Sequence, residues 1–216
     1  IDGITSGAIP PEKHEYYLNI ISVEVHRLSR LVADLLDISR LESGDRKFVF
    51  DDFDIAEVSR LVIISLGQRL DDKQLDVEFI TENDQMIANG DVDAIHQVLY
   101  NLCHNAIKFA HEGGRFIIKI ERYEAKKIRV SVLDDGDCLV GEDKDRVFDR
   151  FYKTDKSRGL DKSGVGLGLY ISKTIVDAHG ENIWVESKEE CTEFVFTLRE
   201  GTSSPKRKFA QKEDEK

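Results

Sequence analysis

The chain has 216 residues, of which 40% are hydrophobic and 34% charged, and its net charge is −11. This length accommodates one or two domains, and the acidic balance argues against non-specific binding of nucleic acids, whose phosphates need a basic surface. The sequence has no apolar run of about 18 residues, the minimum for a transmembrane helix. Its three scattered cysteines, Cys103, Cys138 and Cys191, indicate a reducing compartment and neither a disulfide framework nor a zinc site.

The N-terminal part predicts one long helix after an irregular, glycine-rich start at residues 1–10. The first residue is Ile1 and not methionine, so we expect a fragment of a longer protein. Between Glu12 and about Ser43 apolar residues repeat with helical spacing, which is typical of a helical hairpin or bundle dimer. The seam residues are Ile21, Leu28, Leu31, Leu35 and Ile38. A long amphipathic helix packed on its own domain is the alternative, and Gly44 is the expected end of the helix.

After Gly44 the sequence predicts alternating strands and helices. A helix is predicted over 55–70 with Asp54 as its cap, and a second one over 91–110 with Asp91 as its cap. Strands are predicted where polar and apolar residues alternate. These segments are 47–53, 75–80, 115–122 and 127–133.

The C-terminal half begins with a long charged stretch over 135–165, a length that in a compact domain indicates a lid or a disordered loop. A glycine-rich turn, a helix to about His179 and strands at 182–187 and 192–198 follow, and the polar tail from Gly201 is expected to be disordered. The element order predicts an α+β fold. It is a two-layer α/β sandwich with an antiparallel-rich mixed sheet and helices on one face, preceded by the long bundle helix.

Three glycines at alternate positions precede the last predicted helix. Because glycine has no Cβ, the backbone at Gly164, Gly166 and Gly168 can approach a ligand closely. The helix that follows directs free N–H groups and a partial positive charge toward that ligand, which favours phosphate. A flexible loop that happens to precede a helix is the alternative.

The predicted helix over 91–110 carries Asn101, Asn105 and Lys108 on one face. Burying two amides and an ammonium group without partners would cost roughly 1–3 kcal/mol for each group, so we expect this face to meet a ligand or a cleft. An amide oxygen suits Mg²⁺, which retains waters and phosphate oxygens in its coordination shell, and the lysine can reach a phosphate. A solvated stripe on a surface helix is the alternative.

Two further segments carry candidate site residues. Asp134 and Gly136 end a predicted strand, where a carboxylate can accept a hydrogen bond from an exocyclic amine such as that of adenine and a glycine lets the base lie against the backbone. An ordinary Asp-Asp-Gly turn is the alternative. Within the long charged stretch, Phe148 and Phe151 are predicted to anchor a lid by burial, with or without a ligand role. Arg150 between them projects toward a phosphate or a carboxylate.

In this order the motifs resemble those of the catalytic domain of sensor histidine kinases. That domain has the Bergerat-type ATP fold of the superfamily shared with gyrase, the mismatch-repair MutL proteins and the large heat-shock chaperone. Asn101 to Phe109 resembles the family's N box, Asp134 to Gly136 its first glycine box, Phe148 to Tyr152 its F box, and Gly164 to Leu169 its second glycine box. Residues 12–43 resemble the second helix of the dimerisation and histidine-transfer domain.

The resemblance implies three parts: a partial dimerisation domain at 1–44, a catalytic ATP-binding domain at 45–200, and a polar tail at 201–216. ATP and Mg²⁺ are the implied cofactors, and Asn105 is the implied metal ligand, under a mobile lid over about 138–165. The implied nucleotide-binding residues are Asn101, Asn105, Lys108, Phe109, Asp134, Gly136, Arg150, Tyr152, Gly164, Gly166, Leu167, Gly168 and Leu169.

The same resemblance implies an activity. The intact protein would transfer the γ-phosphoryl group of ATP to a histidine and then to an aspartate of a response-regulator receiver domain. It would form a homodimer through the bundle helix. The chain would be the cytoplasmic portion of a membrane-bound sensor, whose membrane segments lie outside this chain. The family's His-Glu-Leu-Arg-Thr-Pro type acceptor segment is absent, and neither His14 nor His26 matches it. We therefore expect ATP binding without self-phosphorylation and name no catalytic residue.

Three positions depart from the family pattern: Cys138, Glu181 and Cys191 stand where glycines are usual. A Cβ at Cys138 would cost roughly 1 kcal/mol if that position required a positive φ. Because of these departures, the alternative interpretation is that the chain is a degenerate, non-catalytic dimerisation or interaction module. A related protein-serine kinase is a third possibility, which the acid lability of the phosphorylated product would distinguish.

Overall fold

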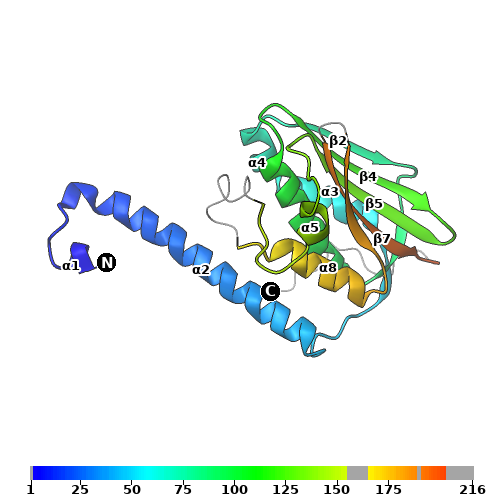
Figure 1. The fold of residues 1–216 in the computed structure, drawn as a ribbon, viewed down its shortest axis with the longest axis horizontal. Coiled ribbons are helices and arrows are strands. Elements are labelled where there is room, and N and C mark those ends of the chain that lie inside the picture. Colours follow the sequence, from blue (N-terminus) through cyan, green and yellow to red (C-terminus); the bar gives the residue numbers. More distant parts are fainter. Residues whose placement is uncertain (1, 155–164, 189–190, 203–216) are drawn as a thin grey trace.

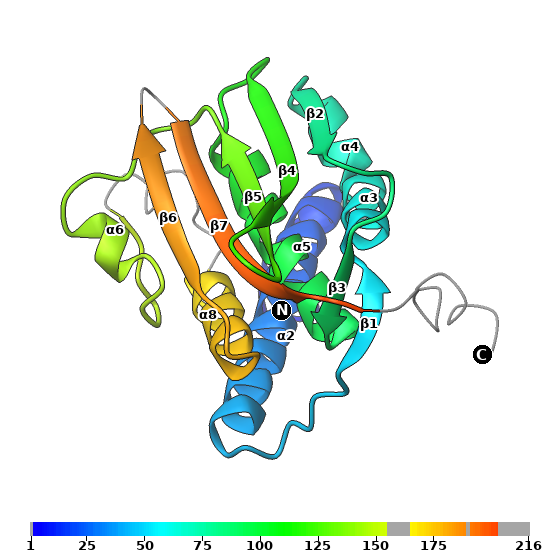
Figure 2. The ribbon, with the colours of Figure 1, turned by 90° about the vertical axis from the view of Figure 1, so that its right-hand side faces the viewer.

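The computed structural model describes residues 2–154, 165–188 and 191–202. These residues form a seven-stranded sheet with helices on one face, and a long helix lies beside the helical layer (Figures 1 and 2). The strands are β1 (Asp51–Asp54), β2 (Asp76–Thr81), β3 (Ile87–Gly90), β4 (Arg115–Tyr123), β5 (Lys127–Asp134), β6 (Ile183–Lys188) and β7 (Cys191–Glu200). The helices are α1 (Asp2–Thr5), η1 (Pro11–Lys13), α2 (His14–Glu42), α3 (Ile55–Ser65), α4 (Gly67–Asp72), α5 (Val92–Phe109), α6 (Asp143–Arg146) and α8 (Gly168–Ala178).

The sheet is mixed and mainly antiparallel, as predicted. Its order is β1-β3-β7-β5-β4-β2, and β6 pairs with β7. The pair β2–β4 is parallel, whereas the other pairs are antiparallel. β5 and β7 pair along most of their length, with Asp134 opposite Thr192. This register places the end of β5 beside the start of β7.

The core lies between the sheet and the layer formed by α3, α5 and α8. On β4 the alternate residues Phe116, Ile118 and Ile120 are fully buried, so one face of the strand contacts the helices. α5 contacts α3, α8 and β5, which makes it the central helix of the layer. Each large side chain buried in this way contributes about 1.5–3 kcal/mol. The predicted two-layer sandwich is confirmed.

Side-chain caps fix where α3 and α5 begin. Asp54 accepts a hydrogen bond from the N–H of Ala56 at 3.0 Å, and Asp91 accepts one from Ala94 at 3.0 Å. Such caps contribute about 1 kcal/mol each. Both predicted caps are confirmed.

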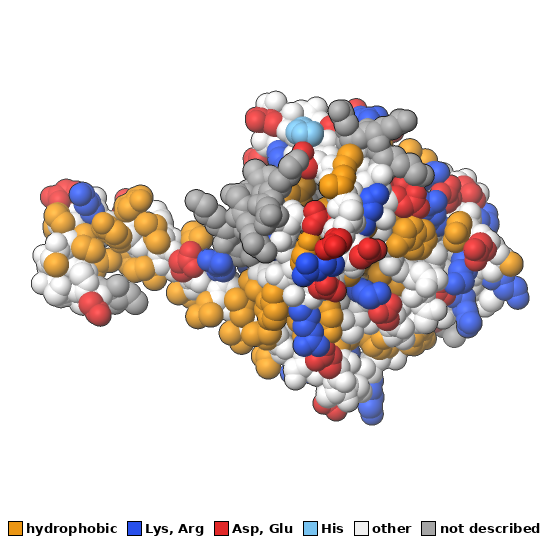
Figure 3. Space-filling view, in the orientation of Figure 1, with side chains coloured by type: hydrophobic (Ala, Val, Ile, Leu, Met, Phe, Trp, Pro, Cys, Tyr) orange, Lys and Arg blue, Asp and Glu red, His pale blue; other side chains and the backbone are white. Residues whose placement is uncertain are grey.

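The helix α2 runs for 29 residues and ends just before Gly44, which has a φ of +74° and so adopts the left-handed conformation expected at a helix end. Its C-terminal half lies along α8, and its N-terminal half projects past the sandwich (Figure 1). Hydrophobic side chains gather on its surface (Figure 3). The exposed ones include Tyr16, Leu18, Val25, Leu28, Val32 and Leu36. Among the described helices, none combines the length and the apolarity that crossing a bilayer requires.

Two predicted boundaries were wrong because tertiary contacts override the local pattern. The strand predicted at 47–53 begins only at Asp51, since the N–H of Val49 donates to the Asp91 carboxylate and the Phe48 ring packs on His179. The helix predicted over 55–70 is broken at Leu66, whose N–H still bonds to Val62 and Ile63, and continues as α4.

Three short elements were not predicted. α1 is a single turn in the glycine-rich start, and α6 is a single turn in the stretch predicted as a loop. β3 pairs with both β1 and β7 although it has only four residues. Runs this short carry too little periodicity to be recognised. Most of the predicted tail (203–216) and part of the predicted lid (155–164) lie outside the described residues.

Candidate functional site

Three of the four groups of predicted site residues meet around α5: those at the end of β5, on the polar face of α5 and at the start of α8. Asn101 of α5 donates to the carbonyl oxygen of Gly168 at 3.2 Å, which joins α5 to the start of α8. The carbonyl of Phe109, the last residue of α5, lies against Gly136 after β5. Two of the sequence-predicted clusters therefore border one helix.

Asp134 is a buried carboxyl at the end of β5, with 2% of its surface exposed. Burial is the largest cause that raises its pKa, and the nearby Asp135 also raises it, whereas the N–H of Gly136, Lys73 and His111 lower it; the net result is a pKa of about 7. The Gly136 N–H donates to Oδ1 at 3.0 Å. The carboxyl therefore changes its charge near neutral pH, and its ionised form is favoured by any additional hydrogen-bond donor brought into the site.

Gly136 occupies a position that has no room for a side chain. A Cβ there would lie 2.3 Å from the carbonyl oxygen of Phe109 and 2.7 Å from Oδ1 of Asp134. Its φ is not in the left-handed region, so the requirement for glycine is steric. The close approach in the structure is to the end of α5, and the predicted approach of a base to this backbone stays a prediction.

On the polar face of α5, the Asn101 amide is hydrogen-bonded to other described residues, whereas the Asn105 amide is not. Asn101 also lies 3.5 Å from the Ser172 hydroxyl. Asn105, one turn later, is partly exposed, and its amide makes no hydrogen bond to another described residue. The Lys108 ammonium group lies 4.9 Å from the centroid of the Phe109 ring. Asn105 thus has an amide oxygen available to a ligand.

The second glycine cluster leads directly into α8. Gly164 lies outside the described residues, whereas Gly166 has a φ of +78° and a Cβ there would lie 2.7 Å from the carbonyl oxygen of Tyr152. Leu167 is buried and Leu169 is half-buried. Because α8 begins at Gly168 without a side-chain cap, the N–H groups of its first turn and its positive end are open to an anion.

The aromatic cluster at 148–152 matches the prediction only in part. Phe148 is buried and packs edge-on against Phe194, with ring centroids 6.2 Å apart. Phe151 was predicted to be buried as well, but 58% of its surface is exposed. The reason is its backbone: at a φ of +58° its N–H donates to the carbonyl of Gly166 at 3.0 Å, and the side chain turns outward. The Tyr152 hydroxyl donates to Asp143.

Arg150 contacts a carboxylate, one of the two partners that the sequence left open. It forms an ion pair with Glu42 at the end of α2 and donates to the Tyr170 hydroxyl at 2.8 Å. That hydroxyl donates in turn to Glu42 at 2.6 Å, and the guanidinium group lies 4.7 Å from the ring centroid of Tyr170. This arrangement joins the segment before the second glycine cluster to α2.

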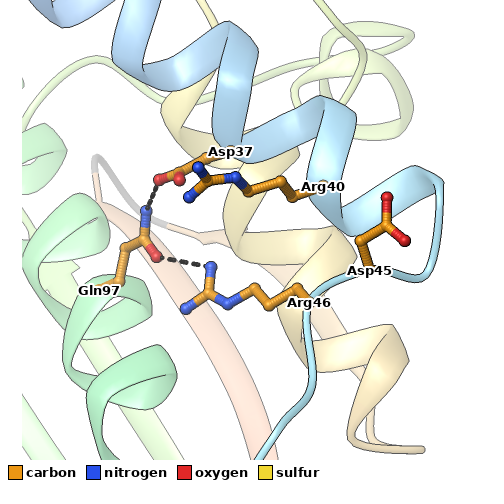
Figure 4. A pocket seen from close by; sticks show the side chains of 5 residues that line it. All are labelled: Asp37, Arg40, Asp45, Arg46 and Gln97. Carbon is orange, nitrogen blue, oxygen red and sulfur yellow. Dashed lines mark hydrogen bonds between the residues drawn. The ribbon is translucent and has the colours of Figure 1, made fainter.

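A cavity of about 550 Å³ lies between the end of α2 and α5, and Asp134 is not among the residues that line it (Figure 4). Its lining residues are Asp37, Arg40, Asp45, Arg46 and Gln97. Gln97 donates to Asp37 at 3.3 Å and accepts from Arg46 at 3.1 Å. Gln97 was not predicted as a site residue, although its position four residues before Asn101 extends the polar face of α5 by one turn. The cavity is therefore part of the contact between α2 and the sandwich.

The departures from the glycine pattern cause no visible strain. Cys138 does not have a positive φ. Among the described residues, the non-glycine residues with a positive φ are Gln74, Glu124, Lys126 and Phe151. The conditional cost of a Cβ at Cys138 therefore does not arise. Glu181 accepts from Thr197 at 2.6 Å and forms an ion pair with Lys127 at 3.0 Å.

The comparison of sequences places the chain in a family of ATPases. The model of the family described as "Histidine kinase-, DNA gyrase B-, and HSP90-like ATPase" matches residues 90–202. The chain is 37% identical over 186 residues to the sensor histidine kinase WalK of Bacillus subtilis, a match that covers 84% of the chain and 30% of WalK. It spans between 30% and 42% of the length of the first curated relatives it matches.

The comparison of structures gives the same family. The catalytic domain of the histidine kinase ThkA in a nucleotide-free form is 33% identical, with a TM-score of 0.63; the match covers 70% of this chain and 98% of that domain. The structure of ThkA in complex with the response regulator protein TrrA is 31% identical, with a TM-score of 0.72, and the match covers 89% of this chain and 53% of that one.

Proposed function

The chain belongs to the family of histidine kinase-, DNA gyrase B- and HSP90-like ATPases, and from this premise we propose that it is the ATP-binding catalytic part of a two-component sensor histidine kinase. In this proposal residues 45–200 are the catalytic domain, 1–44 belong to the dimerisation and histidine-transfer domain, and 201–216 are a tail. The observation that carries the proposal is the buried carboxyl of Asp134, which lies beside the helix that presents the open amide of Asn105.

The residues present fit a nucleotide with its metal ion. In this proposal Asp134 accepts a hydrogen bond from the adenine amine, and the tight packing of Gly136 against Phe109 keeps the backbone in place beside the base. The N–H groups at the start of α8 and the ammonium group of Lys108 bind phosphates. Asn105 is the protein ligand to Mg²⁺, which keeps its other positions for waters and phosphate oxygens.

Catalysis then depends on positioning and on charge neutralisation. Bound ATP supplies the γ-phosphoryl group, and Mg²⁺ neutralises the charge on its phosphates. The chain holds the nucleotide between α5 and α8 so that the phosphoryl group meets a histidine on a bundle helix. Arg150 and Tyr170 hold the end of α2 beside this site through Glu42. We infer that this contact sets one arrangement of the catalytic domain on its bundle.

Two kinds of partner follow from this proposal. The exposed apolar side chains on α2 fit a second copy of the same helix in a four-helix bundle, which gives a homodimer. The ThkA complex shows a related kinase with a response regulator, and the proposed partner of this protein is likewise a receiver domain that takes the phosphoryl group on an aspartate. The proposed location is the cytoplasmic portion of a sensor.

Titration of the chain with Mg-ATP by calorimetry tests the binding site. We expect a Kd below about 1 mM, with Mg-GTP binding at least about tenfold more weakly because its base presents a carbonyl oxygen where adenine has an amine. Absence of binding up to millimolar Mg-ATP would refute the ATP site. Equal binding of the two nucleotides would remove Asp134 from base recognition.

The affinity for ATP is expected to rise with pH between about 6 and 8. The pKa of Asp134 is raised to about 7 in the free protein, and the adenine amine donates to the ionised form, so binding competes with the proton below that pH. For a single group the expected gain is about tenfold over this range. Calorimetry at several pH values measures it, and the Asp134→Asn variant reports the protonation of the phosphates alone. Parallel profiles for the two proteins would contradict the prediction.

The free protein is expected to show the opposite trend in stability. A folded-state pKa raised above the ordinary value of 3.8 means that the fold favours the protonated carboxyl. The resulting stabilisation is complete below pH 3.8 and is lost as the pH rises through about 7. Urea unfolding of the wild type, compared with Asp134→Asn across this range, isolates the contribution of this group.

A further inference from the structure

We propose that Cys138 and Cys191 form a reversible disulfide beside Asp134 and that closing it weakens ATP binding. The second half of this proposal rests on the proposed function. The three cysteines are scattered in the sequence, but the fold brings two of them together: Sγ of Cys138 lies 3.8 Å from the carbonyl oxygen of Cys191. Both thiols are free and partly exposed, so a reagent in solution can reach them.

The backbone on both sides of Cys138 is held against the end of the β6–β7 hairpin. The Thr192 hydroxyl donates to the carbonyl of Asp137 at 3.1 Å. The N–H of Leu139 donates to the Ser187 hydroxyl at 3.2 Å. Cys138 lies between these two bonds, and Cys191 is the residue next to Thr192. The two cysteines therefore lie on adjoining segments whose relative position is already fixed by hydrogen bonds, which favours pairing because little chain entropy remains to be lost.

The third cysteine provides an internal comparison. Cys103 lies in the middle of α5 and is fully buried, and this burial raises the pKa of its thiol far above the ordinary value. The thiolate is the form that reacts with a disulfide, so Cys103 is expected to be inert. In a reducing compartment the Cys138–Cys191 bond would form only when a disulfide oxidant is present, as expected of a regulatory bond and not of a structural one.

The pair is coupled to the proposed adenine site through both segments. Cys191 adjoins Thr192, which lies opposite Asp134 across the β5–β7 ladder. Cys138 is two residues after Gly136, which has no room for a Cβ beside Phe109 and Asp134, so a shift of this segment is transmitted to both. Bringing two sulfur atoms to bonding distance, about 2 Å, moves the segment from Gly136 to Leu139 relative to β7. The expected consequence is a displaced Asp134 and a lower affinity for ATP.

The chemistry is an exchange with a low-molecular-weight disulfide such as oxidised glutathione. The thiolate of Cys138 attacks one sulfur of the reagent, forms a mixed disulfide and releases one thiol. The thiolate of Cys191 then attacks the sulfur of Cys138, forms the internal bond and releases the second thiol. The protein thus loses two protons and two electrons, and the reagent is reduced to two thiols.

The test uses the whole chain with oxidised glutathione at about pH 8, since burial and the neighbouring Cys138 raise the pKa of the Cys191 thiol while Arg115 lowers it. Free thiols are alkylated, and mass spectrometry of proteolytic peptides identifies the linked residues. We expect a Cys138–Cys191 link in the wild type and in Cys103→Ala. The link should be absent from Cys138→Ser and Cys191→Ser, and dithiothreitol should remove it.

Calorimetry with Mg-ATP on the oxidised and reduced protein tests whether the disulfide weakens ATP binding. We expect oxidation to weaken binding about fivefold or more in the wild type and in Cys103→Ala, and to leave Cys138→Ser unchanged. Absence of the linked peptide, or a link through Cys103, overturns the pairing, and a link with unchanged affinity overturns the coupling. If the reduced protein binds no ATP, the proposed function fails and the coupling with it, while the linked peptide still decides the pairing.

Discussion

Replacing Asn105 by alanine is expected to abolish magnesium-dependent ATP binding and transfer of the phosphoryl group to a histidine. The amide of Asn105 makes no hydrogen bond to another described residue, so its oxygen is available as a metal ligand. Alanine removes that ligand without creating an unpaired group in the protein, and it favours the helix. The expected loss in transfer to a separately supplied histidine-bearing bundle domain is at least about 100-fold.

The measurement has two parts and a matched control. Calorimetry with and without Mg²⁺ shows whether the metal contribution to ATP binding is lost, and thermal unfolding shows whether the fold is retained. Gln97→Ala is the control, because it removes an amide from the same face of α5 two turns earlier, where the partners are Asp37 and Arg46. Gln97→Ala should bind Mg-ATP as the wild type does. Undiminished transfer by Asn105→Ala would refute the metal role.

The centre of the sandwich could be predicted because its signals are local. α5 has a long apolar period, a capping aspartate before it and polar residues at helical spacing, and the structure contains the helix from Val92 to Phe109 with Asp91 as its cap. The strands at β4 and β5 likewise alternate over eight or nine residues. The closeness of Asp134 and Gly136 to the C-terminal end of α5 could be inferred only from the family resemblance, because it depends on how β5 packs under the helix.

Two of the failures share a cause, which is contact between residues far apart in the sequence. Nothing near Phe48 shows that its ring packs on His179, so the strand was predicted to begin too early. Nothing near Arg150 indicates that Glu42 is its partner, 108 positions earlier. Gln97 is a different case, because its helical spacing from Asn101 is visible in the sequence although the predicted polar face begins at Asn101.

The cysteine pair illustrates the same limit for the site itself. Cys138 and Cys191 are 53 positions apart, and their spacing carries no signal of proximity. What unites them is the antiparallel pairing of β5 with β7, which brings the end of one strand to the start of the other. Strand pairing is a property of the whole sheet, so a chemical property that depends on it emerges only with the fold.

At Gly136 both the fold and the proposed site depend on the absence of a Cβ atom. Replacing it by alanine places a Cβ 2.3 Å from the carbonyl oxygen of Phe109, which is backbone at the end of α5 and cannot rotate away. The loop or the helix end must move, at a cost of about 1–3 kcal/mol in unfolding free energy. The same movement displaces Asp134, whose Oδ1 accepts from the Gly136 N–H at 3.0 Å, so ATP binding should fall by more than about tenfold.

Urea unfolding and calorimetry of Gly136→Ala measure both effects, and Gly67→Ala is the matched control. Gly67 begins α4 with a φ outside the left-handed region, and a Cβ there would meet nothing within 4 Å. The control should be stabilised by about 0.5–1 kcal/mol, because alanine in a helix restricts the unfolded chain. The same glycine-to-alanine change is therefore expected to lower the free energy of unfolding at Gly136 and to raise it at Gly67. If Gly136→Ala were as stable as the wild type and bound ATP equally well, the contact with Phe109 could not be what positions Asp134.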